Sequence, residues 1–334
     1  TSEDTKEEEF SKADKEDMLA EGSTEYPVWI KNDIRINSDN KDDVLGDGGS
    51  IKYEPASGGQ RAKLILNNLR AEEDTSGVSD WFYKFIKADE AIDLILKGEN
   101  VINITAAEGA HTDNLDFICI IDGTTVYCDG EGGGSLSIDI NAETKLKKLE
   151  DLVGISAQIG RLSNAKLDIN IHGYAQYVRS MNDFDDINNA TLNIDANVGY
   201  NDKLLGSDGT GYIVQITGRE DLNITSSNIN IHTKCRGGFS DIRLTGIQAI
   251  ELNIKGSYKI DLEGYIWLFN SDNVGINFED ISPGSYFILR NEALKEVLAC
   301  HNSVPVGKAK FSVPDVAAVL AGASEENAKL IAKE

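Results

Sequence analysis

Basic residues are scarce in this chain of 334 residues, and so are proline and long apolar runs. Asp and Glu number 56 against 32 Lys and Arg, which gives a formal net charge of −24. Nucleic-acid binding needs Lys and Arg to displace counterions, so this balance excludes DNA and RNA and disfavours anionic membranes as partners. The chain also lacks the run of about 18 apolar residues that signals a membrane span. We therefore expect no transmembrane segment.

Cysteine spacing and catalytic motifs exclude several further classes. Cys119, Cys128, Cys235 and Cys300 show no CxxC spacing and no paired His, so a structural zinc site is not expected. We expect Cys119, in an apolar run, to pack as a small hydrophobe. GxSxG, P-loop and strand-to-helix GxGxxG motifs are missing, which leaves serine hydrolases and nucleotide-binding proteins without support.

The chain contains instead a repeated short sequence motif with the alternation typical of a β-strand. With 31 glycines and 5 prolines, it favours short strands separated by tight turns. Apolar-polar-apolar triplets recur 24 to 34 residues apart, the extremes being Leu252 to Ile276 and Ile102 to Leu136. Their first residues are Ile102, Leu136, Leu167, Leu192, Leu222, Leu252 and Ile276.

Two further alternating segments accompany most triplets, for example 117–123 upstream and 229–232 downstream. A period of this length indicates a solenoid, a propeller or an array, and the shortest spacings are too short for a propeller blade. Three short strands per repeat are typical of a parallel β-helix. We therefore predict an all-β, single-stranded parallel β-helix that stacks each strand on its equivalent one coil along.

This fold predicts which side chains of the triplets point inward. Leu192, Ile194, Leu222 and Ile224, with Leu252 and Ile254, are expected in the core. The middle residues are expected to form one outward polar column, made of Asn103, Ser137, Asp168, Asn193, Asn223, Asn253 and Asn277.

A family resemblance supports the same fold. Segments 64–69, 94–104 and 120–140 carry "LILNNL", "LILKGENVINI" and "IIDGTTVYCDGEGGGSLSIDI". With the later repeats, over roughly residues 45–290, they resemble the secreted right-handed parallel β-helix proteins of gut and other anaerobic bacteria, described as carbohydrate-binding-domain-containing or pectate-lyase-like. The resemblance implies a right-handed coil, an extracellular location and possible glycan contact. It implies no catalytic residue, because this fold carries many functions.

The two ends differ in composition from the repeats. Residues 1–25 are acid-rich and are expected to be a disordered tether, compatible with a secreted protein or with a lipid anchor on a removed N-terminal segment. Residues 26–290 would form the β-helix, beginning with a strand or cap at 26–36. Residues 291–334 are expected to be an α-helical cap, with helices over 291–302 and 313–334. The aromatic segment 74–91 is expected to be a helix or loop packed on the column.

Some carboxylates and cations are candidates for an ion-binding site or a catalytic site. Asp122, Asp129 and Glu131 are close enough in sequence to supply the two carboxylates of a glycosidase. They could instead mark Asp-Gly turns, or hold Ca²⁺, although no DxDxDG run is present. A polysaccharide lyase would need an outward Arg or Lys beside an acid. The candidate cations are Arg161, Arg179, Lys234, Arg236 and Arg243. His172 and His232 stand in matching contexts, and we interpret them as outward strand residues.

The remaining surface chemistry suits sugars. We predict a non-catalytic extracellular or cell-surface module that binds neutral polysaccharide and needs no cofactor unless calcium takes part. The candidate ligand-binding residues are Tyr174, Tyr177, Tyr212, Tyr258, Tyr265, Trp267, Asn193, Asn223 and Asn253. The alternatives are an adhesin or other protein-contacting surface module, and a polysaccharide lyase or glycoside hydrolase.

Overall fold

The computed structural model describes residues 22–249, 251–264, 275–281, 286–291 and 298–299. Within these ranges the chain is all-β, apart from one 3₁₀ turn, η1 (Thr112–Asn114). Short strands precede the first long strand: β1 (Glu25–Ile30), β2 (Ile34–Asn37), β3 (Ile51–Glu54), β4 (Ala62–Asn67), β5 (Arg70–Asp74) and β6 (Phe82–Ala88).

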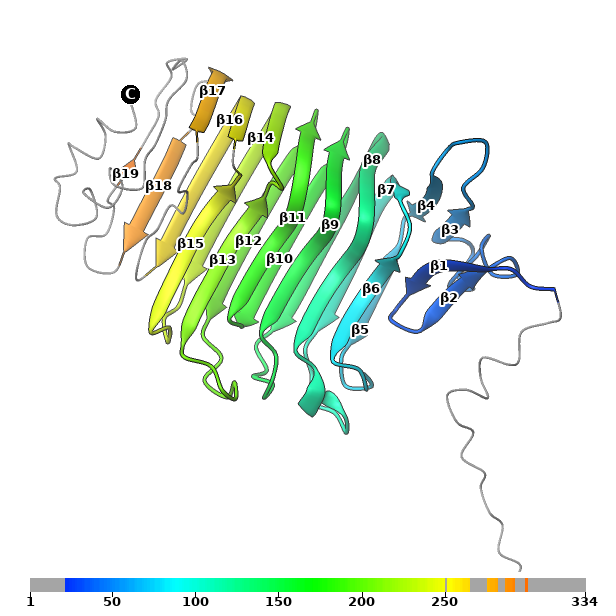
Figure 1. Cartoon of the computed structure of the whole chain (residues 1–334), viewed down its shortest axis with the longest axis horizontal. Helices are drawn as coiled ribbons and strands as arrows, with labels where there is room; N and C mark the ends of the chain where they lie inside the picture. The colour runs from blue at the N-terminus through cyan, green and yellow to red at the C-terminus, as the bar shows by residue number, and fades with distance from the viewer. Residues whose placement is uncertain (1–21, 250, 265–274, 282–285, 292–297, 300–334) are drawn as a thin grey trace, which may run out of the picture.

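The long strands follow one another along the longest axis of the molecule (Figure 1). They are β7 (Ile92–Thr105), β8 (Phe117–Ala142), β9 (Asp151–Ser163), β10 (Lys166–Tyr174), β11 (Tyr177–Asn188), β12 (Thr191–Gly199), β13 (Thr210–Thr217), β14 (Asp221–Cys235), β15 (Asp241–Gln248) and β16 (Glu251–Gly264). The last described strands are β17 (Gly275–Ile281), β18 (Tyr286–Asn291) and β19 (Leu298–Ala299).

Parallel pairing joins these strands into three ladders. Strands β7, β8, β9, β11, β14 and β16 each contribute to more than one ladder, whereas β10, β12, β13 and β15 each belong to one. Ladder A runs through β4, β7, β8, β9, β11, β14, β16 and β17. Ladder B runs through β5, β7, β8, β10, β12, β14, β16 and β18. Ladder C runs through β6, β8, β9, β11, β13 and β15.

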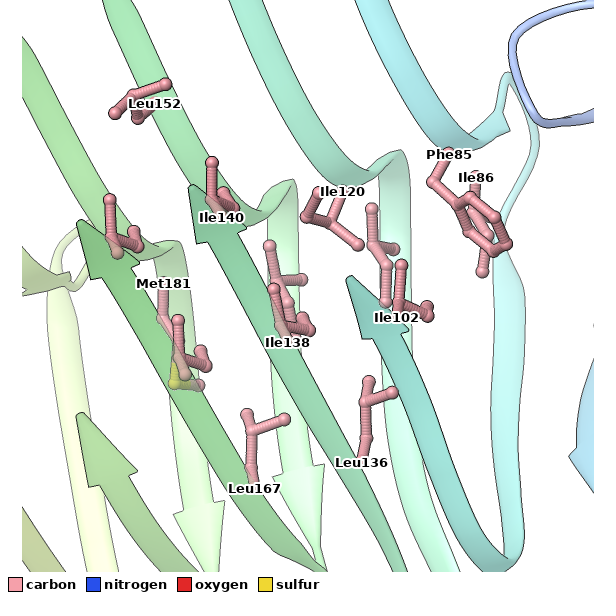
Figure 2. Packing of buried hydrophobic residues seen from close by; sticks show 14 of the residues in the cluster. Phe85, Ile86, Ile102, Ile120, Leu136, Ile138, Ile140, Leu152, Leu167 and Met181 are labelled. Carbon is pink, nitrogen blue, oxygen red and sulfur yellow. The ribbon is translucent and has the colours of Figure 1, made fainter. Parts of the chain in front are cut away.

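The apolar side chains of the ladders meet in one interior. Figure 2 shows Leu136, Ile138 and Leu167 of ladder B packed in the same cluster as Leu152 and other ladder C residues, all fully buried. The predicted interior positions Leu192, Ile194, Leu222 and Ile224 are buried, whereas Asn193 is half-buried and Asn223 is exposed. The inward and outward assignment of these residues is therefore confirmed.

The single outward column is wrong, because the triplets belong to two ladders. Leu136, Leu167 and Leu192 are neighbours in ladder B, where the next residue is Ile229. Leu222 instead pairs with Leu252 in ladder A, and Ile276 follows. Ile102 pairs with Ile138 instead of Leu136. Both ladders need the same inward-outward alternation of side chains, so the same apolar-polar-apolar triplet fits either ladder.

The corner between ladders A and B depends on left-handed backbone. Asn68, Asn164, Asn189 and Ser226 have φ between 48° and 55°. Asn189 Nδ2 donates to Asn164 Oδ1 at 2.9 Å, and Asn164 Nδ2 donates to Asp129 Oδ2 at 3.1 Å. Asn tolerates this conformation because its side chain bonds locally, so the amides join successive corners.

A polar bridge crosses the apolar interior. Ser180 Oγ of β11 donates to Gln215 Oε1 of β13 at 2.6 Å, and Gln215 Nε2 donates to Thr233 Oγ1 of β14 at 2.9 Å. All three side chains are fully buried. The bridge therefore satisfies these buried polar groups while linking ladder C to ladder B.

Two predictions about irregular segments need correction. In the segment 74–91, residues 75–81 form an irregular turn, as the loop alternative predicted, but 82–88 is strand β6 in ladder C, because its alternating Tyr83 and Phe85 fill the interior. The helix predicted over 291–302 is wrong at its described residues: Asn291 ends β18, and Leu298–Ala299 form β19, which pairs antiparallel with β18. Edge-strand hydrogen bonding outweighs helical spacing there. Residues 1–21 of the tether and the helix at 313–334 lie outside the described residues.

The N-terminal hairpin covers the start of ladder C. β1 pairs antiparallel with both β2 and β6, and β3 pairs antiparallel with β4 at the start of ladder A. The segment 26–36, predicted to be a first strand or a cap, is thus a hairpin paired to the edge of β6. It occupies hydrogen-bonding groups that an exposed edge would offer to another chain.

Candidate functional site

A chain of hydrogen-bonded polar side chains runs across the outer surface of ladder B. Asp168, Asn193 and Asn230 are register neighbours on β10, β12 and β14. Asn230 Nδ2 donates to Asn193 Oδ1 at 2.8 Å, and Asn193 Nδ2 donates to Asp168 Oδ1 at 2.6 Å. The carboxylate end orients both amides in the same sense, since a charged acceptor forms the stronger bond. We call these three residues the amide lane.

A second lane runs parallel to it, two residues along each strand. Asn170, Asp195 and His232 are register neighbours on the same three strands. His232 Nδ1 lies 3.2 Å from Asp195 Oδ1, and about half of each side chain is exposed. We call this set the acid-histidine lane.

An open groove of about 210 Å³ lies along these lanes. Its polar lining is supplied by Asn193 and Asn230 of the amide lane, by the acid-histidine lane and by the exposed Lys259 of β16. The buried Ile194 and Ile231 separate the lanes in sequence and also contribute to the lining. We call this the amide groove; its residues are Asn170, Asn193, Ile194, Asp195, Asn230, Ile231, His232 and Lys259.

Charges of both signs surround the amide groove. Lys166 Nζ lies 2.8 Å from Asp168 Oδ2 at the end of the amide lane. On β8, which neighbours β10, burial raises the pKa of Asp139, and the charge of His172 opposes that shift. The groove therefore presents amides, a carboxylate, an imidazole and an ammonium group within one surface.

The predicted ligand-binding tyrosines fall elsewhere. Tyr174, at the end of β10, is flanked by two cations: Lys145 Nζ lies 4.4 Å and Arg236 Cζ 4.6 Å from its ring centroid. Tyr177 and Tyr212 are register neighbours on ladder C. The backbone of Tyr258 pairs with Ile229 in ladder B, while Tyr265 and Trp267 lie outside the described residues.

The predicted asparagines are split between two ladders. Asn193 belongs to the amide groove. Asn223 and Asn253 are neighbours in ladder A, following Asp186 in the same row. The structure therefore brings together parts of the predicted site and does not unite them on one surface.

The predicted metal ligands are also divided. Asp122 lies in the ladder C part of β8, and its Oδ2 is 2.6 Å from Lys84 Nζ. Asp129 and Glu131 lie in the ladder A part. Asp129 accepts from Asn164, and Glu131 Oε1 lies 3.4 Å from Lys97 Nζ. Over the described ranges, no three His, Cys, Asp or Glu residues gather where they could hold a metal ion.

A second unusual feature is an acid within an aromatic row of ladder C. The row runs Phe82, Phe117, Asp151, Tyr177 and Tyr212 on successive strands. Burial beside Phe117 and Tyr177 raises the pKa of Asp151 to about 6; the positive charge of Arg179 opposes this shift, and the carboxylates of Glu150 and Asp116 add to it. A carboxyl group that titrates near neutrality on a surface is a candidate acid or base.

The candidate lyase cations do not converge. Arg161 lies on ladder A, its Cζ 4.6 Å from the ring centroid of Tyr127. Arg179, and Arg243 by its backbone register, belong to ladder C. Lys234 lies near the end of the ladder B part of β14, and Arg236 follows that strand, its Nη1 3.1 Å from Glu143 Oε2. Arg179 is the cation whose charge acts on Asp151.

The sequence did not predict that Asn230, Asp195 and His232 line one groove with Asn193. The available signal was the repeated "INIH" at 169–172 and 229–232, but the register places His232 beside Asp195 and His172 beside Asn197. The two histidines thus occupy different rows. A register shift of two residues cannot be read from periodicity alone, because it keeps every side chain on the same face.

No family model, curated protein or solved structure matches this chain. In the part of the chain that the structure describes, no helix is both long enough and apolar enough to cross a membrane.

Proposed function

We propose that this chain is a non-catalytic glycan-binding module of the cell surface or extracellular space, built on a right-handed, single-stranded parallel β-helix. The three parallel ladders support the β-helix as its architecture. The observation that carries the function is the amide groove, where two polar lanes face the same open space.

The groove offers both the hydrogen-bond donors and the hydrogen-bond acceptors that sugar hydroxyls need. Each carboxamide nitrogen of the amide lane uses one N–H within the lane and carries a second N–H. Asp195 supplies acceptor oxygens opposite these donors. Hydroxyl groups both donate and accept, so they can bridge the lanes without a charged partner. Neutral polysaccharide is therefore the proposed ligand class.

The net charge narrows the ligand further. At −24 the protein repels polyanions such as pectate or heparin-like chains at long range. Calcium could bridge an anionic chain to surface carboxylates, so the binding assay needs an arm with calcium and one without. The proposal itself requires no cofactor.

A glycan array at physiological salt tests this function. Wild-type protein is expected to bind neutral glycans with or without calcium, and Asn193→Ala to lose most of that signal. The matched control is Asn188→Ala, an exposed asparagine of ladder A, which should bind as wild type. Absence of signal on every glycan would instead favour a surface protein as the partner.

Polysaccharide cleavage is a second candidate function, favoured by Asp151. Its raised pKa and the nearby charge of Arg179 are the features that an acid or base catalyst on ladder C would need. Incubation of bound polymers with wild-type protein and with Asp151→Asn tests it through reducing ends and unsaturated uronate absorbance. Product that accumulates with wild type and not with the variant would replace binding by catalysis as the function.

A further inference from the structure

The amide lane is regular and directional, which restricts the shape of a ligand that follows it. The pairings of β8, β10, β12 and β14 in ladder B continue without a register shift. Neighbouring parallel strands lie about 4.8 Å apart, so Asp168, Asn193 and Asn230 present polar groups at a regular interval. Both lane hydrogen bonds point toward Asp168.

From this geometry we infer that the ligand of the amide groove is an extended, unbranched chain of sugars with vicinal hydroxyls, lying across the strands. This inference rests on the proposed glycan-binding function and adds the class of glycan and its direction. The chain would run along the groove from Asn170 toward His232 and Lys259, so that consecutive sugars contact equivalent positions on successive strands.

The two lanes together favour vicinal hydroxyls, because each strand places a hydrogen-bond donor of one lane beside an acceptor of the other. On β12 the amide of Asn193 and the carboxylate of Asp195 stand two residues apart on the same face. The amide offers a donor and the carboxylate offers acceptors. Two adjacent hydroxyls of one sugar can accept from the first and donate to the second. β14 repeats the arrangement with Asn230 and His232, where the imidazole replaces the carboxylate.

Repetition along the lane predicts a dependence on chain length. Contacts made by each further sugar are intramolecular once the first is bound, so the affinity rises with each subsite filled. A flat β-1,4-linked chain can remain beside a regular lane over several units. A helical α-1,4-linked chain curves away from it after the first contacts.

The experiment is calorimetric titration with cello- and manno-oligosaccharides from disaccharide to hexasaccharide, with malto-oligosaccharides of equal length as the curved comparison. The association constant is expected to rise with length for a β-linked series and to stay lower for malto-oligosaccharides. Asn193→Ala and Asn230→Ala should each weaken hexasaccharide binding about fivefold to tenfold, the loss of one hydrogen bond. Asn188→Ala on ladder A is the control, expected to bind as wild type.

The outcomes separate this inference from the proposed function. Two outcomes would overturn the extended-chain ligand and leave glycan binding standing. One is an affinity for oligosaccharides that does not depend on their length. The other is binding of the Asn193→Ala and Asn230→Ala variants that equals the binding of wild type. No binding to any glycan on the array or in the oligosaccharide series would overturn both. The length series uses wild-type protein alone, so it decides the question even if a variant folds poorly.

Discussion

Burial of a carboxylate is costly, and Asp151 is partly buried in the ladder C row, where its register neighbours are Phe117 and Tyr177. Its folded-state pKa of about 6 lies above the ordinary value. A raised carboxyl pKa means that the folded state holds its proton more tightly than the unfolded state does. Stability from this group is therefore fully present below the unfolded pKa of about 4 and is lost as the pH rises through about 6.

Asp151→Asn is accordingly expected to stabilise the protein at pH 7 to 8, because the amide cannot ionise. The gain is on the order of 1 to 3 kcal/mol and should shrink toward zero near pH 4. Urea unfolding at several pH values measures it. Asp221→Asn, at an exposed position, is the control and should change stability by less than about 0.5 kcal/mol at any pH. Equal effects of the two substitutions would contradict the burial of Asp151.

Ile224 is fully buried where ladder A faces the interior. Ile224→Ala should lower the free energy of unfolding by about 2 to 5 kcal/mol, because the hydrogen-bonded ladders cannot close around the cavity. Ile224→Val should cost only about 0.5 to 1.5 kcal/mol. Denaturant midpoints of the two variants give the comparison, and an unchanged midpoint for Ala would place Ile224 outside the core.

Among the elements, the corner between ladders A and B shows how side chains support a bend. Asn164 adopts φ of 55° and joins Asn189 to Asp129 through its amide. At Gly98, in the same series of corners, an added Cβ would lie 2.1 Å from Asn68 Oδ1. Some corners are therefore held by an asparagine amide, and the corner at Gly98 requires glycine.

Replacing Asn164 in two ways separates these requirements. Asn164→Gly should lose only the side-chain hydrogen bonds, whereas Asn164→Ala also places a non-polar Cβ residue in left-handed backbone. We expect Ala to be less stable than Gly by about 1 kcal/mol, measured by thermal or urea unfolding. If Ala proved as stable as Gly, the backbone conformation at this corner would not be the limiting factor.

The periodicity of the sequence predicts where the strands lie, but it does not predict which strands pair with one another. The alternation around Leu192 and Leu222 correctly predicts which side chains are buried. It does not reveal that Leu192 pairs with Ile229 while Leu222 pairs with Leu252. Pairing is decided by corner lengths and by contacts between residues distant in sequence, and a two-residue shift preserves the inward-outward pattern. The site was predictable at Asn193 but not at His232 for the same reason.

Across the whole molecule, an excess of negative charge opposes compactness. The formal charge of −24 creates self-repulsion that added salt screens. Raising NaCl from about 0.01 M to about 0.5 M should increase the melting temperature by several degrees at pH 7.5. The same titration near the sequence pI of about 4.5 is the control, since little repulsion remains there. A melting temperature independent of salt at pH 7.5 would show that opposite charges already balance locally.

Similar repeats create a risk during folding, because a strand can dock one repeat away from its correct partner and still bury its apolar side chains. The bridge from Ser180 through Gln215 to Thr233 discriminates between these registers. Only the native alignment gives the buried carboxamide of Gln215 both a donor and an acceptor. A slipped alignment would leave it unsatisfied, at a cost of about 1 to 3 kcal/mol for each lost partner. One polar residue in the interior thus makes otherwise interchangeable repeats distinguishable to the folding chain.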